Sequence, residues 1–480
     1  FIAAAGLATT AALSGCSTQP RPDSSTRHRV AVVGGGLAGL SAAVALRNAG
    51  WDVVVLEARN RVGGRVHTLY APFTGGLHVE AGGESIDDNH THIRALAHHY
   101  GLALAHRPAD KLQTAAFYRA GARSSLGAVA ANDPGALSGY LAFGNALVTM
   151  AGDLDPSHPE RASRAEEWDG QSLADFAATQ TLDPNAALLV QSDYRGNYNA
   201  EFEQVSLLFV LQQSVVDEAL PESGVETMRI AAGNSALPEA LARDLGGAVR
   251  LESAVTRIEQ RPWGVRIHSG TRSGSSQPVD ATRVVIAVPP PALRSVVFDP
   301  PLSPGLEAMI AELDLGHALK VSTEYDKRFW RTEGLSGFTI SDLPFGVGWD
   351  ATDSVPASPE SPGVLTQFVT GSAAQLGAAL PDRARIASFQ QQLDVVYPEG
   401  KPDRSEVATT MAWANERYTG GGYAVYAPGQ MTRFWPLLRE PHGPIWFAGE
   451  HTETLAGYME SAIRSGQRVA AAIGPAPRST

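Results

Sequence analysis

The 480-residue sequence predicts an α/β fold of two domains, in which a parallel-sheet domain is interrupted by an inserted α+β domain. Two segments near opposite ends of the chain predict the parallel-sheet domain. In the first, a strand over 30–33 runs into Gly34-Gly35-Gly36-Leu37-Ala38-Gly39, an Ala-rich helix follows to Gly50, and a strand over 52–56 ends at Glu57. This order of strand, glycine turn, helix, strand and acid is typical of a Rossmann-like dinucleotide-binding unit.

Each residue of this motif has a physical role in that interpretation. Gly34 permits the tight turn, Gly36 lets the backbone approach a pyrophosphate, and Gly39 allows the helix to pack closely on the strand. Glu57 stands where a carboxylate accepts hydrogen bonds from a ribose. The helix that begins near Ala38 offers unpaired N–H groups to phosphate.

The second segment begins about four hundred residues later, where an apolar strand over 445–448 ends in Gly449-Glu450 and a helix begins near Gly457. Apolar residues recur at helical spacing, which predicts that one face packs against the body of the protein. They are Met459, Ala462, Ile463, Gly466, Val469, Ala470 and Ile473. The N-terminus of this helix is left facing a ligand, and its partial positive charge would stabilise an anion such as a reduced flavin ring.

With these segments in view, the chain resembles the flavin-containing amine oxidases, the family of monoamine, polyamine and L-amino-acid oxidases, from about Arg29 to Ile473. Further support comes from the stretches 61–65, 80–84 and 413–423 and from Lys320. The resemblance implies FAD as cofactor. It also implies a set of cofactor-binding residues, namely Gly34, Gly36, Gly39, Glu57, Arg59, Gly64, Arg65, Gly82, Gly83, Glu84, Val255, Trp413, Gly449, Glu450, Tyr458 and Met459.

The division into domains follows from the positions of these segments. Residues 28–105, 227–302 and 413–475 are expected to form a discontinuous Rossmann-like FAD-binding domain. Residues 106–226 and 303–412 are expected to form the inserted α+β substrate-binding domain, with the ligand between the two domains.

Local patterns predict several elements inside these pieces. Strands are predicted over 249–258, 315–325 and 363–370, and a helix over 384–397. The apolar run 205–211 favours a helix, although a short run of this kind does not by itself exclude a strand.

Three residues are predicted to be catalytic. Tyr423 and Tyr458 occupy positions that resemble the family's two facing aromatic residues, which confine a substrate amine and attract its cation. Lys320 interrupts an apolar stretch. In the family this lysine holds a water next to flavin N5 and assists reoxidation by dioxygen. The alternatives are two packed tyrosines and an edge-strand lysine that reaches solvent.

Two departures from the family pattern bear on the cofactor and the substrate. Covalent members link the flavin through a cysteine just before the first cage tyrosine, but this chain has Gly422 there, so FAD is expected to be non-covalent. Many L-amino-acid oxidases have an arginine shortly after the glycine pair, whereas this chain reads Glu84-Ser85-Ile86-Asp87-Asp88. Acid near the cleft favours a cationic amine over an amino acid, although Glu84 could equally bond the cofactor.

The first residues resemble an export signal. Residues 1–16 have its apolar character and end in Leu13-Ser14-Gly15-Cys16, which resembles a bacterial lipobox. Residues 17–27 then form a flexible tether rich in Ser, Pro and Arg. We therefore expect an exported protein, anchored at the outer face of the cell membrane by lipid on Cys16 or located in the periplasm. The alternative is a stray cysteine in a disordered leader.

Net charge and histidine spacing argue against nucleic acid and metal ions as partners. The net charge of −12 argues against nucleic acid, because phosphate binding needs clustered Lys and Arg. The thirteen histidines show no metal-binding spacing, so no metal is expected. His90, His92, His98 and His99 are interpreted as solvated helix or loop residues.

These observations together predict an FAD-dependent amine oxidase. It would move a hydride equivalent from the carbon next to the amine to flavin N5, and dioxygen would reoxidise the flavin with release of hydrogen peroxide. The imine would hydrolyse to an aldehyde or keto product plus ammonia or an amine. The alternatives are an L-amino-acid oxidase, a related FAD-dependent desaturase or dehydrogenase, and an anchored FAD-binding scaffold. The sequence does not identify the amine or the oligomeric state.

Overall fold

The computed structural model describes residues 28–108, 111–219, 226–271 and 274–477. The predicted signal remnant 1–16, with Cys16, and the predicted tether 17–27 lie outside the described residues. In the described ranges, no helix is both long and apolar enough to cross a membrane.

The first domain is built on a five-stranded parallel sheet with the strand order β21-β14-β1-β2-β9. Its strands are β1 (Arg29–Val33), β2 (Asp52–Leu56), β9 (Val249–Arg250), β14 (Arg283–Ile286) and β21 (Ile445–Phe447). Both faces are covered, which is why the strands read as continuous apolar runs. Val30, Val32, Val53 and Val55 face one core, and Ala31, Val33, Val54 and Leu56 face the other.

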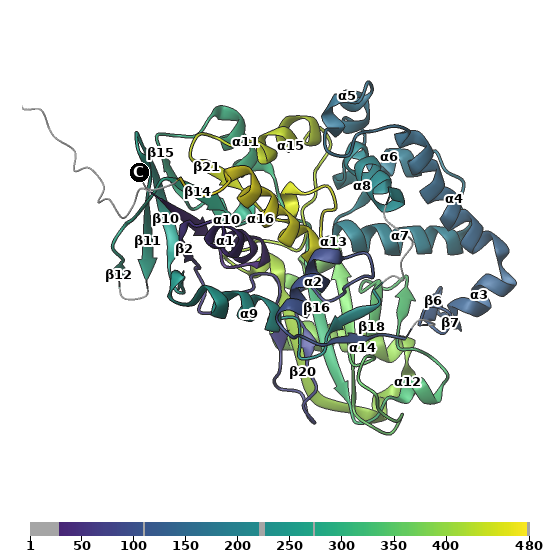
Figure 1. Cartoon of the computed structure of the whole chain (residues 1–480). Coiled ribbons are helices and arrows are strands. Elements are labelled where there is room, and N and C mark those ends of the chain that lie inside the picture. Colours follow the sequence, from purple (N-terminus) through teal and green to yellow (C-terminus); the bar gives the residue numbers. More distant parts are fainter. Residues whose placement is uncertain (1–27, 109–110, 220–225, 272–273, 478–480) are drawn as a thin grey trace, which may run out of the picture.

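Helices α1 (Leu37–Asn48) and α16 (Met459–Ile473) pack side by side on the first of these faces, although they come from opposite ends of the sequence (Figure 1). A Cβ added at Gly466 would lie 2.2 Å from the Ala38 carbonyl oxygen. Glycine is therefore required for the two backbones to approach this closely. Helices α2 (Thr91–His99) and α9 (Ala236–Leu245) extend the same core.

The predicted strand 249–258 is wrong as a single element. After β9 the chain turns at Glu252, whose φ is +51°, and continues as β10 (Ala254–Arg261) in a second sheet. The turn is fixed because the Glu252 and Ser253 amides donate to the carbonyls of Arg59 and Glu57, next to the glycine turn. The second sheet also contains β11 (Gly264–Thr271), β12 (Gly274–Ser275), β13 (Val279–Ala281) and β15 (Val297–Asp299).

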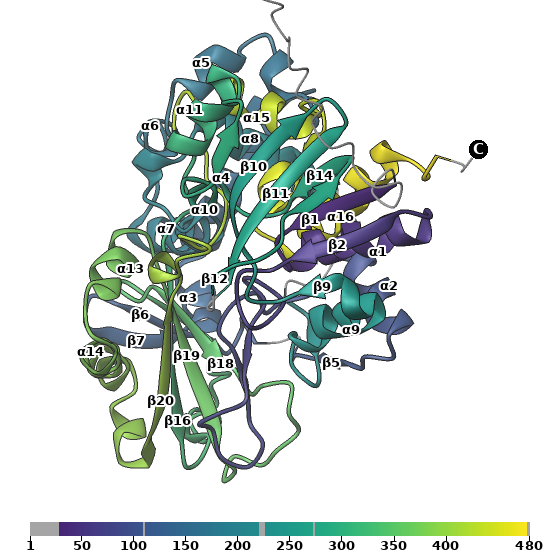
Figure 2. The same cartoon turned by 90° about the vertical axis from the view of Figure 1, so that its left-hand side faces the viewer.

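The second domain contains a seven-stranded sheet with the order β20-β16-β19-β18-β17-β6-β7, which lies below the parallel sheet in Figure 2. Its strands are β6 (Ala116–Arg119), β7 (Ala122–Ser125), β16 (Ala318–Tyr325), β17 (Thr339–Ser341), β18 (Val347–Asp350), β19 (Gly363–Thr370) and β20 (Arg404–Ala412). Strand β16 is buried along its whole length between β19 and β20. Helices α12 (Phe329–Thr332), α13 (Gly371–Ala378) and α14 (Asp382–Val396) contribute to its core.

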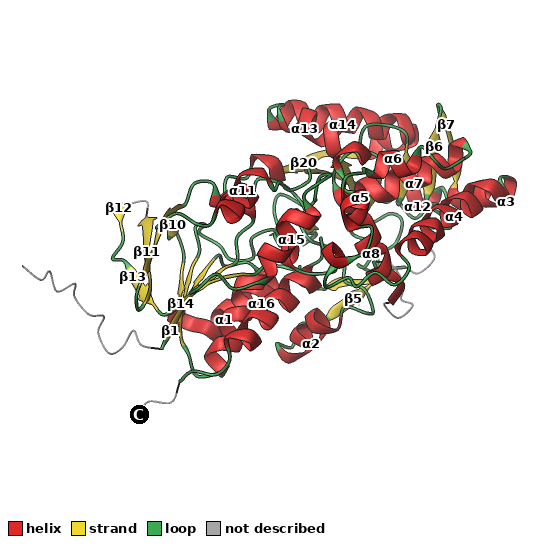
Figure 3. Ribbon diagram, turned by 90° about the horizontal axis from the view of Figure 1, so that it is seen from above, coloured by secondary structure: helices red, strands yellow, loops and turns green. Residues whose placement is uncertain are grey.

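Several helices of the residues 106–226 gather at one end of the molecule (Figure 3). They are α3 (Leu126–Asn132), α4 (Pro134–Ala151), α5 (Ala165–Asp169), α6 (Leu173–Ala177), α7 (Pro184–Tyr198) and α8 (Leu207–Ala219). Phe143, Trp168 and Leu208 from this group share one hydrophobic core with Val33 and Ile258 of the first domain. The seven-stranded sheet is thus separate from the parallel sheet, whereas the two domains share one hydrophobic core.

Two short antiparallel pairs and a few connecting helices complete the fold. The pairs are β3 (Thr68–Leu69) with β4 (Val79–Glu80), and β5 (Leu104–His106) with β8 (Met228–Ile230). The connecting helices are α10 (Pro290–Leu293), α11 (Pro304–Glu312) and α15 (Met431–Arg439). The predicted α/β fold with a Rossmann-like domain and an inserted α+β domain is confirmed.

Replacing Gly466 by Ala is expected to destabilise the protein by about 1–3 kcal/mol, because the new Cβ would overlap backbone atoms of α1. The matched control is Gly196→Ala in α7, where an added Cβ meets nothing within 4 Å. That change should be neutral or slightly stabilising, because Ala favours helix over Gly. Urea unfolding measures both free energies, and equal effects at the two positions would contradict the close-packing account.

Candidate active site

The glycine turn after β1 has the geometry that a bound pyrophosphate needs. Gly34 has a φ of +105°, and a Cβ at Gly39 would lie 2.0 Å from the Gly34 carbonyl oxygen. A Cβ added at Gly36 would meet only the Gly63 carbonyl oxygen, at 3.9 Å. Gly36 is the N-cap of α1, and no side chain caps the helix there. The free N–H groups of the first turn therefore suit an anion.

Glu57 is buried at the end of β2 and faces this turn. Its carboxylate accepts hydrogen bonds from the Gly35 amide (2.6 Å) and the Arg59 amide (2.8 Å). A carboxylate has about four acceptor positions, so capacity remains for a ribose. The Arg59 guanidinium donates to Glu416 Oε2 (2.6 and 2.9 Å) and to Thr419 Oγ1 (2.7 Å), which ties this loop to the C-terminal part of the domain.

Three further predicted residues are Gly64, Gly449 and Val255. Gly64 has a φ of +58°, and a Cβ there would lie 3.5 Å from Gly36 Cα. Gly449 has a φ of +143°, and its amide donates to Ser465 Oγ on α16. Val255, at the start of β10, is partly buried against the core.

Glu450 holds together three segments from different parts of the chain. It accepts a hydrogen bond from Arg65 Nη1 (2.6 Å), and the amides of Ala424 (3.2 Å) and Gly457 (2.9 Å) donate to it as well. Arg65 Nη1 also donates to the Gly422 carbonyl oxygen. Burial alone would raise the pKa of Glu450, but the charge of Arg65 and the hydrogen bonds from Arg65 and the Gly457 amide, with His451, together outweigh it, so the pKa lies below its ordinary value.

The Gly82-Gly83 turn lies between Arg65, Trp413 and Met459. A Cβ at Gly82 would lie 1.7 Å from the Arg65 carbonyl oxygen and 3.0 Å from the Trp413 ring, and a Cβ at Gly83 would lie 3.0 Å from Met459 Cγ. Trp413 Nε1 donates to the Ala81 carbonyl oxygen (2.8 Å). Five predicted cofactor residues thus converge, namely Arg65, Gly82, Gly83, Trp413 and Met459. Tyr458 precedes Met459 as the N-cap of α16, and no side chain caps this helix.

Gly422 leaves no room for a thiol. A Cβ at this position would lie 2.7 Å from Ala318 Cβ and 2.9 Å from Asn199 Nδ2. The two uncapped helix starts, the free capacity of Glu57 and the glycine turns fit an FAD molecule. The crowding around Gly422 agrees with FAD that is held without a covalent bond.

Lys320 is buried on β16, and solvent does not reach it from the edge of the sheet. The ammonium donates to the Glu80 carbonyl oxygen (3.0 Å), the Gly82 carbonyl oxygen (2.9 Å) and Glu84 Oε2 (2.9 Å). An ammonium has three N–H donors. All three of them have acceptors within the protein.

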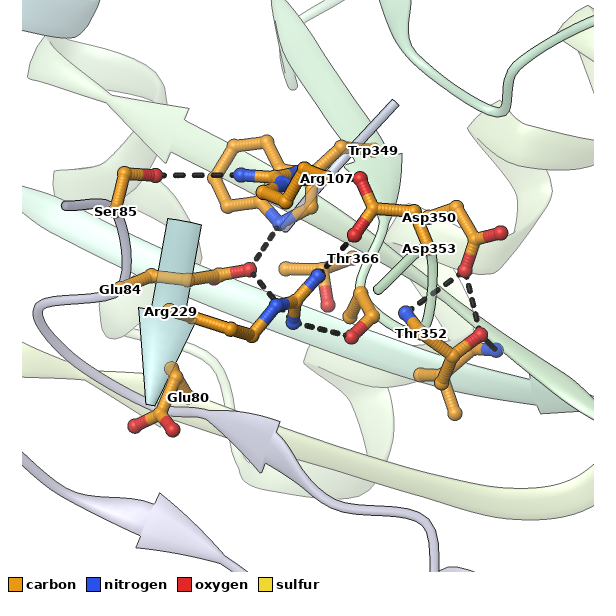
Figure 4. Close-up of polar contacts among 12 residues, drawn as sticks. Glu80, Glu84, Ser85, Arg107, Arg229, Trp349, Asp350, Thr352, Asp353 and Thr366 are labelled. Carbon is orange, nitrogen blue, oxygen red and sulfur yellow. Dashed lines mark hydrogen bonds and ion pairs between the residues drawn. The ribbon is translucent and has the colours of Figure 1, made fainter. Parts of the chain in front are cut away.

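Glu84 belongs to a buried charge network (Figure 4). Its Oε1 accepts from Trp349 Nε1 (2.9 Å) and lies 3.4 Å from Arg229 Nη1, while its Oε2 pairs with Lys320. Arg229 and Arg107 both pair with Asp353. Burial by itself would raise the pKa of Glu84, but Lys320 and the arginines outweigh burial and lower it to about 2. Both oxygens of this predicted cofactor residue are thus engaged by side chains.

Tyr423 and Tyr458 lie on adjacent segments. A Cβ added at Gly457, the residue before Tyr458, would lie 3.5 Å from the Tyr423 ring. Both tyrosines are partly exposed. Burial in the surrounding protein nevertheless raises the pKa of both hydroxyls, so both stay neutral at physiological pH. His90 packs edge-on against Tyr458 at 5.1 Å between ring centroids and is buried. The interpretation of His90 as a solvated residue is therefore wrong.

Carboxyls from three parts of the chain interact electrostatically with Tyr458. Asp87 precedes α2, Asp193 is on α7 and Asp217 is on α8, and all three add to the raised pKa of the Tyr458 hydroxyl after burial. Desolvation by the protein around it, with the charges of Asp193 and Asp87, raises the pKa of Asp217 to about 7, and the side chain still reaches solvent. Within the described ranges, no group of three or more His, Cys, Asp or Glu side chains is arranged to hold a metal ion.

Comparison with known proteins now decides the family. The family model described as flavin-containing amine oxidoreductase matches residues 37–474. The chain belongs to this family. Its FAD is therefore the cofactor for which the glycine turns and Glu57 are arranged, and the protein is an FAD-dependent oxidoreductase.

Individual family members resemble the chain over most of its length. The flavin-containing amine oxidase of Danio rerio is 29% identical over 458 residues, covering 92% of this chain and 84% of that protein. The L-amino acid dehydrogenase of Synechocystis is 29% identical over 460 residues, covering 92% and 94%. The structure of cyclohexylamine oxidase from Brevibacterium oxydans superposes with a TM-score of 0.82 at 26% identity, covering 93% and 98%.

Sequence reasoning missed Arg107, Arg229, Trp349 and the acids Asp193 and Asp217. None of them belongs to a local motif, and each reaches the site only through long-range contacts. Arg229, for example, bonds to the Ala351 carbonyl oxygen across 122 positions of the sequence. The one available signal was an arginine inside the apolar run of β8.

Replacing Glu450 by Gln is expected to weaken FAD binding by about 10- to 100-fold, because Arg65 would lose its buried counterion beside the cofactor turns. The matched control is Glu453→Gln, a buried glutamate on the next turn that pairs with Arg468. FAD titration of the apoprotein, followed by tryptophan fluorescence, measures both affinities. Unchanged affinity in the Glu450 variant would refute its role at the cofactor.

Proposed function

We propose that the protein is an amine oxidase that takes a cationic amine without a carboxylate group and uses dioxygen as the electron acceptor. The observation that carries this proposal is that Tyr423 and Tyr458 lie on adjacent segments and that three carboxyls interact electrostatically with Tyr458. When bound, FAD takes a hydride equivalent from the carbon next to nitrogen, dioxygen takes the two electrons and two protons as hydrogen peroxide, and water hydrolyses the imine to a carbonyl product and ammonia or a smaller amine.

The chain's own residues orient the amine. Aromatic faces attract a cation by about 0.5–2 kcal/mol, and the effect grows where water is excluded. Tyr423 and Tyr458 are neutral and partly exposed, so they can confine the amine without exchanging protons with it. Asp87, Asp193 and Asp217 add a negative potential that draws the substrate cation toward this pair.

The arginines near the site favour an amine over an amino acid. Arg229 donates to Asp353, Glu84 and the Ala351 carbonyl oxygen, and Arg107 donates to Asp353 and Ser85. Their charges are therefore largely neutralised inside the protein. A substrate carboxylate would have to compete with Asp353 and Glu84 for them.

An L-amino acid is the second candidate substrate, since one relative is named an L-amino acid dehydrogenase. Arg107 Nη2 and Arg229 Nε are also buried without a hydrogen-bond partner in the part of the chain that the structure describes. Oxidation of amino acids faster than of simple amines would select this candidate.

Removing either aromatic face is expected to slow substrate oxidation. Tyr423→Ala and Tyr458→Ala should each lower kcat/KM for an amine by about 2- to 30-fold, the factor that corresponds to one cation–π contact. Tyr423→Phe and Tyr458→Phe keep the ring and serve as matched controls. Stopped-flow reduction under anaerobic conditions measures the effect, and alanine variants that reduce at the wild-type rate would remove the aromatic cage from the account.

The charge of Asp217 should give the reaction a distinct pH dependence. Its pKa is raised to about 7, so the side chain is neutral below that pH and anionic above it. The ratio of kcat/KM for the wild type to that for Asp217→Asn should therefore rise as pH increases through about 7. The ratio cancels the ionisation of the amine itself, and a ratio that stays constant between pH 5.5 and 8.5 would show that Asp217 does not act on the substrate.

A further inference from the structure

Lys320 is fixed by contacts that leave its ammonium no freedom. It lies on an interior strand, it is 6% exposed, and its three donors go to Glu80 O, Gly82 O and Glu84 Oε2. The only charged group among these three acceptors is Glu84. The other two are backbone carbonyls of the segment that carries the Gly82-Gly83 turn.

Glu84 is held as firmly as its partner. Its second oxygen accepts from Trp349 Nε1 and lies beside Arg229 Nη1, so the carboxylate cannot rotate away from Lys320 without losing these contacts. The Trp349 ring also lies 5.0 Å from the Lys320 Nζ, which adds a cation–π contact. Glu84 thus fixes both the position and the counter-charge of the lysine.

The other carboxyls of the network have hydrogen-bond partners of their own. Asp353 is engaged by Arg107 and Arg229. The Glu80 carboxyl bonds to Thr68 and to the Asn234 amide, and burial raises its pKa to about 7. Among the carboxylates of this network, Glu84 is the one that bonds directly to the Lys320 ammonium.

We propose that Glu84 is a positioning residue that holds the Lys320 ammonium beside the Gly82-Gly83 turn, and that this fixed charge promotes the reaction with dioxygen. The proposal rests on the proposed oxidase function, because it assigns Lys320 to the oxygen half-reaction. A fixed positive charge stabilises the negative charge that dioxygen gains as it is reduced.

The first test follows the protonation of Lys320 directly. The chain has only four lysines, at 111, 320, 327 and 401, so lysine labelled with ¹³C at Cε gives a spectrum in which Lys320→Met identifies the Lys320 signal. In Glu84→Gln, this signal should titrate about 1–3 pH units lower than in the wild type, because an opposite charge at hydrogen-bond distance has been removed. The measurement is made on the FAD-loaded protein and repeated after removal of FAD.

The matched control is Glu324→Gln. Like Glu84, Glu324 is a buried glutamate, and it lies on β16, the strand of Lys320. Its carboxylate, however, bonds to Thr74. This variant should leave the Lys320 titration unchanged. Glu84→Asp keeps the charge on a shorter side chain and should shift the titration less than Glu84→Gln. If Glu84→Gln does not fold, the Lys320 titration is measured in Glu84→Asp instead.

The second test separates a positioning role from a merely structural one. In Glu84→Gln, the rate of flavin reoxidation by dioxygen should fall by about tenfold or more as pH rises through the new Lys320 midpoint, a step that the wild type lacks at that pH. Anaerobic reduction by an amine should show no such step, and Glu84→Asp should restore most of the reoxidation rate.

Each outcome decides a separate part of the proposal. A Lys320 signal that titrates at the wild-type pH in Glu84→Gln would overturn the role of Glu84. A lowered midpoint without a matching step in reoxidation would overturn the role of the charge in the oxygen reaction. Failure of every amine to reduce the flavin would instead overturn the proposed function. In that case the titration of Lys320 would still show whether Glu84 positions the lysine.

Discussion

The buried Lys320 ammonium joins the two domains at the centre of the site. The lysine comes from the seven-stranded sheet, and its three acceptors all come from residues 80–84 of the first domain. A buried ammonium is costly unless each donor is satisfied, so the geometry of this segment and the position of β16 constrain each other. The Gly82-Gly83 turn, Trp413 and Met459 are packed around the same segment.

The charged side chains of the site fall into two groups. In one group, three cations, Lys320, Arg229 and Arg107, pair with two carboxylates, Glu84 and Asp353. In the other group, Asp87, Asp193 and Asp217 interact electrostatically with Tyr458. Removing one member of a buried pair costs about 3–5 kcal/mol, so the paired group is rigid.

The sequence predicted what depends on the local backbone and missed what depends on long-range pairing. The roles of Gly34 and Gly39 could be read from their spacing, because a tight turn and a close helix contact need glycine at fixed positions. The partner of Lys320 could not be predicted, since Glu84 precedes it by 236 positions. The strand predicted over 249–258 failed for the same reason, because distant carbonyls of Glu57 and Arg59 turn the chain at Glu252. His90 was likewise expected to be solvated, but it is buried and packs against Tyr458, which is distant in the sequence.

The most direct test of the account is the reduction of the bound flavin without oxygen, followed by admission of oxygen and measurement of peroxide. Substrates are drawn from a panel of simple amines, diamines and L-amino acids. We predict that cationic amines without a carboxylate bleach the flavin faster than amino acids do, and that one hydrogen peroxide is released for each flavin reoxidised. Bleaching by amino acids alone, or reoxidation without peroxide, would contradict the central claim.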